Sequence, residues 1–414
     1  MEASSLVIGG GVAGMAAAVS LADSGVQVHL VEREPFIGGR VSLFSCKATD
    51  RCATCGVCLL PPMLSKTGTS RQLSLLTRST LVGLTRRNGG FRAELLRRPR
   101  YVDPDRCTSC GVCLGVCPTG AIQKPFGEMA PSAYFIDEGK CLHFKGEGCV
   151  LCQERCPARA VAFDNGSKLE LDVGAIIVAT GFEPFEAGEK GSLGYGRYPK
   201  VLTGPDLESM FRREGALKLP GGKQPKDIAF IQCVGSRDES RGSGYCSQVC
   251  CKYAIRFARL IKHQDPEAKV TIFYIDLQTA GKGFAEFFEE CQGVIRFARG
   301  VPVEVNEAPG DRLRVRVEDF AQGRQLEEVF DLVVLSTGIT PRKDSWGLAK
   351  VLGINLDEYG FFESRDGIET NVEGVFLAGT CQGPRDIPGS IAHGLAAAER
   401  AVPFLGKVRR EARR

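Results

Sequence analysis

The sequence predicts an α/β protein with two dinucleotide-binding-type units and a cysteine-rich insertion. Three observations support this prediction. A complete strand, helix and strand pattern with a glycine-rich turn occupies residues 4–34. Buried strands within 171–186 and 330–342 each end in a Thr-Gly turn, and two runs of closely spaced cysteines lie within 101–163. Alternating strands and helices are typical of a mostly parallel sheet, whereas the cysteine runs indicate an inserted module.

The composition is that of a globular protein with two or three domains. The chain has 414 residues, of which 43% are hydrophobic and 25% are charged. A net charge of +4 gives no indication of nucleic-acid binding. No apolar run approaches the length of a membrane span and no signal-type segment opens the chain, so a cytoplasmic location without a direct membrane span is expected. With 18 Cys and 4 His, metal sites are expected to use thiolates.

Residues 4–34 are predicted to bind a dinucleotide. An apolar strand leads into Gly9-x-Gly11-x-x-Gly14, an Ala-rich helix and a second strand that ends at Glu32. Such glycines let the backbone approach a pyrophosphate, and a carboxylate at the end of the second strand receives ribose hydroxyls. Glu32 in place of an Arg favours FAD or NAD over NADP. The expected cofactor contacts of this unit are Gly9, Gly11, Ala13, Gly14, Glu32 and Arg33.

The next segment, residues 45–63, carries four cysteines. Cys52, Cys55 and Cys58 follow C-x2-C-x2-C, and Cys46 lies upstream. The four could hold a 4Fe-4S cluster, although the Cys-Pro ending of bacterial ferredoxins is missing. The alternative is a group of flavin-proximal thiols or a reactive pair. We favour a cluster, which would be the fourth of the chain.

Residues 66–100 alternate apolar and polar positions and turn at Asn88-Gly89-Gly90, which predicts a hairpin. No catalytic residue is recognisable in this segment.

Residues 101–163 contain the most specific pattern of the chain. The first run is C-x2-C-x2-C-x3-C-P, and the second has a longer first spacing before the same ending. In two-cluster ferredoxins, the fourth Cys of each run ligates the other run's cluster. The repeated tails PTGAI (118–122) and PARAV (157–161) agree with such a module, whereas a zinc ribbon does not need Cys-Pro endings. We therefore predict one 4Fe-4S cluster on Cys107, Cys110, Cys113 and Cys156, and another on Cys117, Cys141, Cys149 and Cys152.

A third cysteine group replaces the phosphate loop of the second unit. A strand at 226–232 and a helix at 251–262 flank a glycine-containing turn. Thiolates gathered at such a turn suit a 4Fe-4S cluster, whose negative charge the helix N-terminus would stabilise. Buried core thiols and a structural zinc are the alternatives. Since the Gly-x-Gly-x-x-Gly loop is missing, oxidation of NAD(P)H at this unit is disfavoured. The predicted cluster ligands are Cys233, Cys246, Cys250 and Cys251.

Several segments resemble the FAD-binding parts of two-dinucleotide flavoproteins. PFIGGR (35–40) resembles the segment that follows their second strand. The ATG within 171–186 resembles the ATG segment at which their chain returns to the FAD domain. Residues 370–406 resemble their closing strand, turn and helix, with a helix from about Ser390 aimed at the flavin ring. Typical members have Gly-Asp after that strand, whereas Cys381 follows Gly-Thr here. The resemblance implies FAD and these further contacts: Gly39, Arg40, Ala179, Thr180, Gly181, Gly379, Thr380, Ile387 and Ser390.

The cysteine spacing within 231–262 and the sequence AG-x-CQGP-x-DIP at 378–388 resemble the A subunits of heterodisulfide reductases and their relatives. The resemblance implies a thioredoxin-reductase-like, two-dinucleotide-binding flavoprotein with an inserted dicluster ferredoxin domain. The expected FAD-binding domain comprises 1–100, 166–225 and 341–414. The ferredoxin domain is expected at 101–165, and a degenerate second Rossmann-like domain with its own cluster at 226–340.

This resemblance implies an oxidoreductase subunit that transfers electrons through FAD and iron–sulfur clusters within a complex. Because the chain begins at the FAD strand and stops after the closing helix, it looks most like the short A subunits of the quinone-interacting membrane-bound oxidoreductases of sulfur-metabolising anaerobes. Expected partners are a second flavin and iron–sulfur subunit, a quinone-interacting membrane subunit, and a cytoplasmic reductase or ferredoxin. These partners would make the protein peripherally membrane-associated.

Two other functions remain as alternatives. The first is a flavin-based electron-bifurcating subunit of the heterodisulfide reductase type, for which Arg256 is a candidate flavin neighbour. The second is a self-contained NAD(P)H or ferredoxin oxidoreductase, which the missing second glycine loop disfavours.

Overall fold

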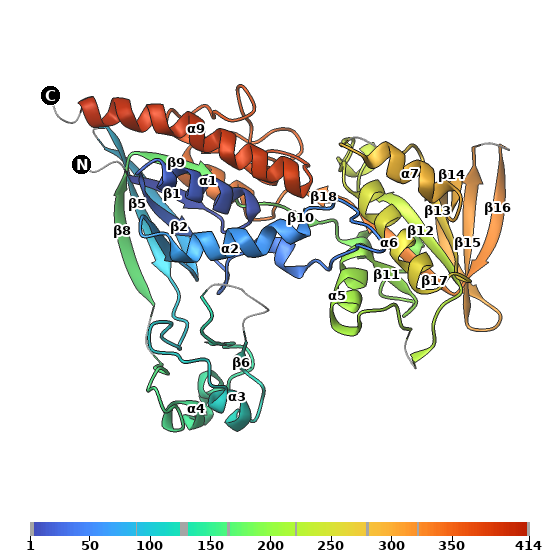
Figure 1. The fold of residues 1–414 in the computed structure, drawn as a ribbon, viewed down its shortest axis with the longest axis horizontal. Coiled ribbons are helices and arrows are strands. Elements are labelled where there is room, and N and C mark those ends of the chain that lie inside the picture. Colours follow the sequence, from blue (N-terminus) through green and yellow to red (C-terminus); the bar gives the residue numbers. More distant parts are fainter. Residues whose placement is uncertain are drawn as a thin grey trace.

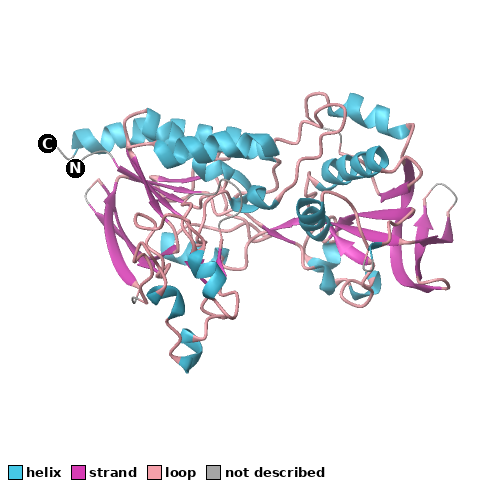
Figure 2. Ribbon diagram, turned by 60° about the horizontal axis from the view of Figure 1, so that its bottom comes forward, coloured by secondary structure: helices cyan, strands magenta, loops and turns pink. Residues whose placement is uncertain are grey.

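The computed structural model describes residues 4–87, 89–124, 131–163, 166–219, 222–278, 281–320 and 323–411. Two sheets with their helices form the larger parts of the molecule, and the cysteine-rich insertion projects from the first of them (Figure 1). The chain crosses between the two sheets twice, at β10 (Glu183–Pro184) and β18 (Ile339–Thr340), which pair antiparallel. Figure 2 shows that loops make up most of the region between the sheets.

The first sheet has five parallel strands in the order β19-β9-β1-β2-β3. Its strands are rich in Val, Ile and Leu because both faces are covered. The helices α1 (Val12–Asp23) and α9 (Ile387–Glu411) pack on one face. They approach closely, since a Cβ on Gly394 would lie 2.2 Å from the Ala13 carbonyl oxygen. The strands are β1 (Ser4–Ile8), β2 (Gln27–Val31), β3 (Leu73–Leu76), β9 (Ala175–Val178) and β19 (Val375–Leu377).

A three-stranded antiparallel sheet covers the other face of the first sheet. It consists of β4 (Ser79–Arg87), β5 (Gly90–Arg97) and β8 (Ser167–Val173). Phe91 and Leu95 of β5 pack into the same core as Leu6 of β1. The predicted hairpin therefore forms, although Asn88 of its turn lies outside the described residues. The helices α2 (Leu60–Thr69) and α8 (Ser345–Leu352) complete this part of the molecule.

The second sheet has seven strands in the order β11-β17-β12-β13-β14-β15-β16. The first five strands in this order are parallel, and the fifth, β14, also starts an antiparallel meander with the last two. The helices α5 (Gly204–Glu214), α6 (Cys250–Gln264) and α7 (Phe284–Gln292) share a core that includes Phe230, Phe257 and Phe284. The strands are β11 (Val201–Thr203), β12 (Asp227–Val234), β13 (Lys269–Tyr274), β14 (Arg296–Ala308), β15 (Arg312–Asp319), β16 (Arg324–Phe330) and β17 (Leu332–Thr337).

The insertion contains little regular structure: α3 (Val112–Val116), α4 (Leu151–Glu154), β6 (Ile122–Gln123) and β7 (Phe135–Ile136). Its small core includes buried cysteine side chains as well as hydrophobic ones. Single turns of 3-10 helix lie at Gly39–Leu43, Val57–Leu59, Ala187–Glu189, Gly191–Leu193, Glu239–Arg241 and Gly379–Cys381, and a π turn at His143–Glu147. None of the helices in the described part of the chain has both the length and the apolar character that a membrane crossing requires.

Candidate cofactor sites

The glycine-rich turn after β1 is shaped by close backbone contacts. A Cβ on Gly9, which has a φ of +112°, would lie 2.3 Å from the Ala179 carbonyl oxygen. A Cβ on Gly14 would lie 1.9 Å from the Gly9 carbonyl oxygen. At Gly11, in contrast, the nearest atom to such a Cβ is 4.0 Å away, on Gly39. The turn therefore requires glycine where it packs and leaves open space at the N-terminus of α1.

The carboxylate of Glu32 is held at this turn from the end of β2. It is buried and accepts hydrogen bonds from the backbone N–H groups of Gly10, at 2.7 Å, and Glu34, at 2.8 Å. Burial raises the pKa of Glu32, and these two hydrogen bonds oppose that shift. A carboxylate has room for further hydrogen bonds, so Glu32 can still receive a ribose hydroxyl. The Arg33 guanidinium lies elsewhere, 2.7 Å from Asp344.

The segments after β9 and β19 meet the glycine-rich turn. A Cβ on Gly379 would lie 2.6 Å from Cβ of Ala13 and 3.9 Å from Cβ of Ser390. A Cβ on Gly181 would lie 3.8 Å from the Thr380 hydroxyl oxygen. Ile387 and Ser390 lie in the first turn of α9, which starts three residues before the expected Ser390. The carboxyl ends of three parallel strands thus converge with two helix N-termini, as at a dinucleotide site.

Two side chains show whether a cofactor fits the site at the glycine-rich turn. The buried hydroxyl of Thr180 has no hydrogen-bond partner in the described protein, so a polar ligand would satisfy it. Arg40 donates from Nε to the carbonyl oxygen of Phe182, at 2.9 Å, and so joins the PFIGGR segment to the ATG segment. The glycine cradle, Glu32 and Thr180 fit a dinucleotide such as FAD.

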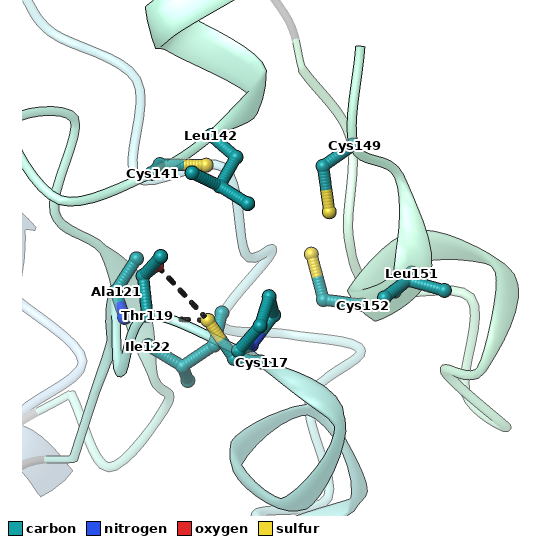
Figure 3. Close-up of a pocket in the computed structure, with 10 residues that line it drawn as sticks. Cys117, Thr119, Ala121, Ile122, Cys141, Leu142, Cys149, Leu151 and Cys152 are labelled. Carbon is teal, nitrogen blue, oxygen red and sulfur yellow. Dashed lines mark hydrogen bonds between the residues drawn. The ribbon is translucent and has the colours of Figure 1, made fainter. Parts of the chain in front are cut away.

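One set of cysteines in the insertion lines a cavity (Figure 3). The sulfur atoms of Cys117, Cys141, Cys149 and Cys152 face the same space. Cys117 accepts a hydrogen bond from the Ala121 N–H, at 3.3 Å. Burial, with smaller contributions from the neighbouring Cys141 and Cys117, raises the pKa of Cys152 to about 11. These four are the residues predicted to hold one cluster, and they include the fourth cysteine of the other run.

The second set in the insertion has the reciprocal arrangement. Burial raises the pKa of Cys113, with further contributions from Cys107 and from Cys156 of the other run. Cys156 accepts from the Ala160 N–H at 3.3 Å, which repeats the contact of Cys117 with Ala121. Cys110 is exposed. The two runs are therefore related by the pseudo-twofold symmetry that the sequence indicates, with their fourth cysteines exchanged.

The third set lies at the carboxyl edge of the second sheet. Cys233 occupies an irregularity in β12 with a φ of 58°, and Cys250 and Cys251 begin α6. A hydrogen bond with Cys233 raises the pKa of Cys250 to about 12. Cys246, in the preceding loop, accepts from the Gln248 N–H at 3.3 Å. Arg237 and Gln248 also have positive φ values, of 55° and 59°. Strained backbone around grouped thiols is a feature of functional sites.

Buried polar side chains beside this third set have no partner in the described protein. Both amide atoms of Gln232 and the hydroxyls of Ser236, Ser336 and Thr337 are unsatisfied. They lie at the ends of β12 and β17, next to Cys233. Each such group costs roughly 1–3 kcal/mol when it has no hydrogen-bond partner. Sulfur atoms of a cluster accept hydrogen bonds, so the three hydroxyls and Nε2 of Gln232 fit an iron–sulfur cluster at this place as donors.

Protein side chains pack against the turn that would hold a nucleotide phosphate in the second unit. Gly235 follows β12, and a Cβ on it would lie 1.8 Å from the ring of Phe185. Asp276, just beyond β13, forms a 2.5 Å ion pair with Arg237. In a nucleotide-binding unit, a carboxylate at the end of the second strand would contact a ribose, whereas Asp276 is paired with Arg237 here. The packing of Phe185 and this ion pair both favour the prediction that this unit does not oxidise NAD(P)H.

The 45–63 segment reaches from the first sheet to the helices of the second. Arg256 of α6 donates from Nε to the Ala53 carbonyl oxygen, at 2.8 Å. Its guanidinium therefore lies beside Cys52 and Cys55, both of which raise its pKa against the larger, lowering effect of burial. Cys46, Cys52 and Cys58 are exposed and Cys55 is half-buried. This set is less enclosed than the other three.

Within the described ranges, no three His, Cys, Asp or Glu side chains converge tightly enough to hold a single metal ion.

Sequence reasoning missed residues that become important only through folding. His393 of α9 accepts from the Gly379 N–H at 2.9 Å and contacts the Gly367 carbonyl oxygen at 2.7 Å. Lys47 and Glu208 form a buried pair between the two sheets. No local pattern marks these residues, because each partner is distant in the sequence.

Comparison with known proteins assigns the chain to a family. The model of the pyridine nucleotide-disulphide oxidoreductase family matches residues 3–400. The chain belongs to this family. It is therefore an oxidoreductase by descent, as the sequence predicts, and the family implies a flavin, FAD.

Curated relatives of this pyridine nucleotide-disulphide oxidoreductase confirm the resemblance to the A subunits of heterodisulfide reductases. The A subunit of the H(2):CoB-CoM heterodisulfide,ferredoxin reductase of Methanothermobacter thermautotrophicus is 38% identical over 97% of this chain and 64% of its own length. The second A-type iron–sulfur subunit of the CoB–CoM heterodisulfide reductase of Methanopyrus kandleri is 41% identical over the same shares. The chain thus spans 64% of the length of these relatives.

Solved structures confirm the predicted fold class. Thioredoxin reductase of Lactococcus lactis matches with a TM-score of 0.56 at 17% identity, over 98% of this chain and 100% of that chain. The flavoprotein disulfide reductase RclA of Escherichia coli matches with a TM-score of 0.52 at 13% identity, over 94% of this chain and 69% of that one. The fold is therefore thioredoxin-reductase-like.

Proposed function

We propose that this chain is the FAD- and iron–sulfur-containing electron-transfer subunit of a heterodisulfide-reductase-like complex. The observation that carries the proposal is the grouping of twelve cysteines into three sets of four, each drawn from separate stretches of sequence. One set lines a single cavity, a second repeats its contacts, and a third is surrounded by unsatisfied polar groups. We assign a 4Fe-4S cluster to each, and a fourth to Cys46, Cys52, Cys55 and Cys58.

The chain's own residues would perform distinct tasks in this function. FAD, when bound, exchanges two electrons with a carrier and single electrons with clusters. The turn from Gly9 to Gly14, with Glu32, would hold its dinucleotide part, and Thr180 would donate a hydrogen bond to it. The third set would accept electrons at the carboxyl edge of the second sheet, while the insertion would carry electrons toward a partner. Phe185 and the Arg237–Asp276 pair would keep a nicotinamide nucleotide out of the second unit.

Composition analysis of anaerobically purified protein tests the proposal. We expect one FAD with about twelve to sixteen irons and as many sulfides per chain. The variant C250A should lose about four irons and one EPR signal on reduction. C291A is the matched control, since Cys291 is a buried cysteine of the same domain that packs in its hydrophobic core. An unchanged iron content in C250A would contradict the assignment of the third cluster. Bound zinc in place of iron would contradict the assignment of all the clusters.

The finer role that we propose is electron relay between a quinone-linked membrane partner and a cytoplasmic reductase. Its support is the sequence resemblance described above, and the protein would then be cytoplasmic and associated with the membrane through other subunits. Affinity purification of the tagged chain from its native cells tests this role. A quinone-reactive membrane subunit should copurify, whereas copurification of only cytoplasmic reductases would contradict it.

Electron bifurcation is the second candidate function. It is favoured by the name of the Methanothermobacter relative, which contains both a heterodisulfide and a ferredoxin. A redox titration of the flavin distinguishes the two functions. A stable one-electron-reduced flavin is expected for simple relay, whereas strongly crossed one-electron potentials would favour bifurcation.

A further inference from the structure

The third cysteine set is flanked by a pair of opposite charges. Arg237 lies in the loop between Cys233 and Cys246, and Asp276 lies just beyond β13. Their side chains meet at 2.5 Å and are 30% and 49% exposed, so the pair lies at the mouth of the site rather than in the core. The pair connects two loops that come from different strands of the sheet.

Backbone contacts place each residue of the pair beside the third cysteine set. The Arg237 N–H donates to the Tyr245 carbonyl oxygen at 2.9 Å, which places Arg237 opposite the residue that precedes Cys246. The next residues, Asp238 and Ser243, form an antiparallel bridge that closes the loop. On the other side, the Asp276 carbonyl oxygen lies 3.9 Å from the sulfur of Cys251. The backbone of Arg237 therefore adjoins the segment of Cys246, the backbone of Asp276 adjoins Cys251, and the two side chains meet each other.

The φ of Arg237 is 55°, a conformation that costs a non-glycine residue free energy, so the loop holds this side chain in place against a local preference.

We propose that Arg237 and Asp276 set the reduction potential of the cluster held by Cys233, Cys246, Cys250 and Cys251, with opposite effects. This inference rests on the proposed function. Reduction adds one electron, and hence one negative charge, to the cluster, and no bond forms or breaks. A guanidinium beside the cluster stabilises the added charge and raises the potential, whereas a carboxylate destabilises it and lowers the potential. In this arrangement the Asp276 carboxylate partly offsets the effect of Arg237 on the reduction potential.

The test compares midpoint potentials in the anaerobically purified protein. Dithionite titration with redox mediators, followed by EPR, gives the potential of each cluster, and the signal missing in C250A identifies the third one. We expect R237Q to shift that potential to a more negative value and D276N to shift it to a more positive one. R241Q is the matched control, because Arg241 lies in the same loop, is exposed and pairs with Glu189 at 3.9 Å. It should leave the potential close to that of the unchanged protein.

A purely structural role gives a different result. Both R237Q and D276N break the same ion pair, so both should lower the thermal unfolding temperature in the same direction. Potentials that stay unchanged, or that move together, in variants with full iron content would overturn the inference and leave the proposed function intact. If C250A retains all its iron, there is no third cluster, and the inference fails together with that part of the proposed function.

Discussion

The ammonium of Lys47 lies 2.5 Å from the carboxylate of Glu208, and both side chains are almost completely buried, with 3% and 9% exposed. Lys47 follows the flavin-type segment of the first sheet, while Glu208 belongs to α5 of the second. Ser45 donates to the same carboxylate from its backbone N–H and its hydroxyl, both at 2.9 Å. The Lys47 ammonium also lies 4.5 Å above the ring of Phe257. This pair therefore joins the two sheets through a desolvated contact.

Removing one partner of this pair should destabilise the protein strongly. K47M leaves the Glu208 carboxylate buried without its counter-charge, and we expect a loss of about 3 kcal/mol in the free energy of unfolding. Chemical denaturation of the anaerobic protein measures this loss. K66M is the control, because Lys66 pairs with Asp23 at 2.7 Å but both side chains are more than half exposed, so the loss should stay below about 1 kcal/mol. Equal losses in both variants would contradict the structural role of the Lys47–Glu208 pair.

The exchange of fourth cysteines in the insertion predicts a crossed pattern of cluster loss. C117A should remove the cluster of Cys141, Cys149 and Cys152, although Cys117 belongs to the other run. C156A should remove the cluster of the first run instead. Each variant is the control for the other. EPR spectra of the reduced variants distinguish the two clusters, and loss of the cluster of its own run in either variant would contradict the arrangement.

The hydroxyl of Thr180 should contribute to flavin affinity but not to folding of the flavin-free protein. Because it has no partner in the described protein, T180V should weaken FAD binding by roughly fivefold, which corresponds to about 1 kcal/mol for one hydrogen bond. Fluorescence titration of flavin-free protein with FAD measures the change. T370V is the control, since the buried hydroxyl of Thr370 donates within the protein to backbone carbonyl groups. That variant should lose stability and keep its FAD affinity.

Stability should fall as the pH decreases from about 7.5 toward about 6. Burial lowers the pKa of His393 and of His29 below the ordinary value of 6.5. Below that value the unfolded chain binds protons that the folded protein does not, so the free energy of unfolding decreases with falling pH. H393Q should remove the share of this decrease that comes from His393. Denaturation at several pH values checks the prediction, and an unchanged slope in H393Q would show that His393 is not buried in its neutral form.

Features that depend on local spacing can be predicted from the amino-acid sequence. The turn from Gly9 to Gly14 and the terminal Glu32 predict the first dinucleotide unit, because backbone approach and a carboxylate are needed at particular points of one βαβ unit. The Cys-Pro runs predict an inserted ferredoxin for the same reason. These predictions need no knowledge of distant contacts, and the fold class that they imply is confirmed.

Which distant groups share one environment is visible only in the folded chain. Folding brings Cys233 of β12 to the thiols of α6, and it leaves Thr337 and Ser336 of β17 unsatisfied beside them in the described protein. It also pairs Lys47 with Glu208 and Arg237 with Asp276, across loops that local patterns do not connect. The physical reason is that burial and charge depend on the sum of neighbours around a site. Those neighbours come from parts of the chain whose proximity is fixed only when the sheets assemble.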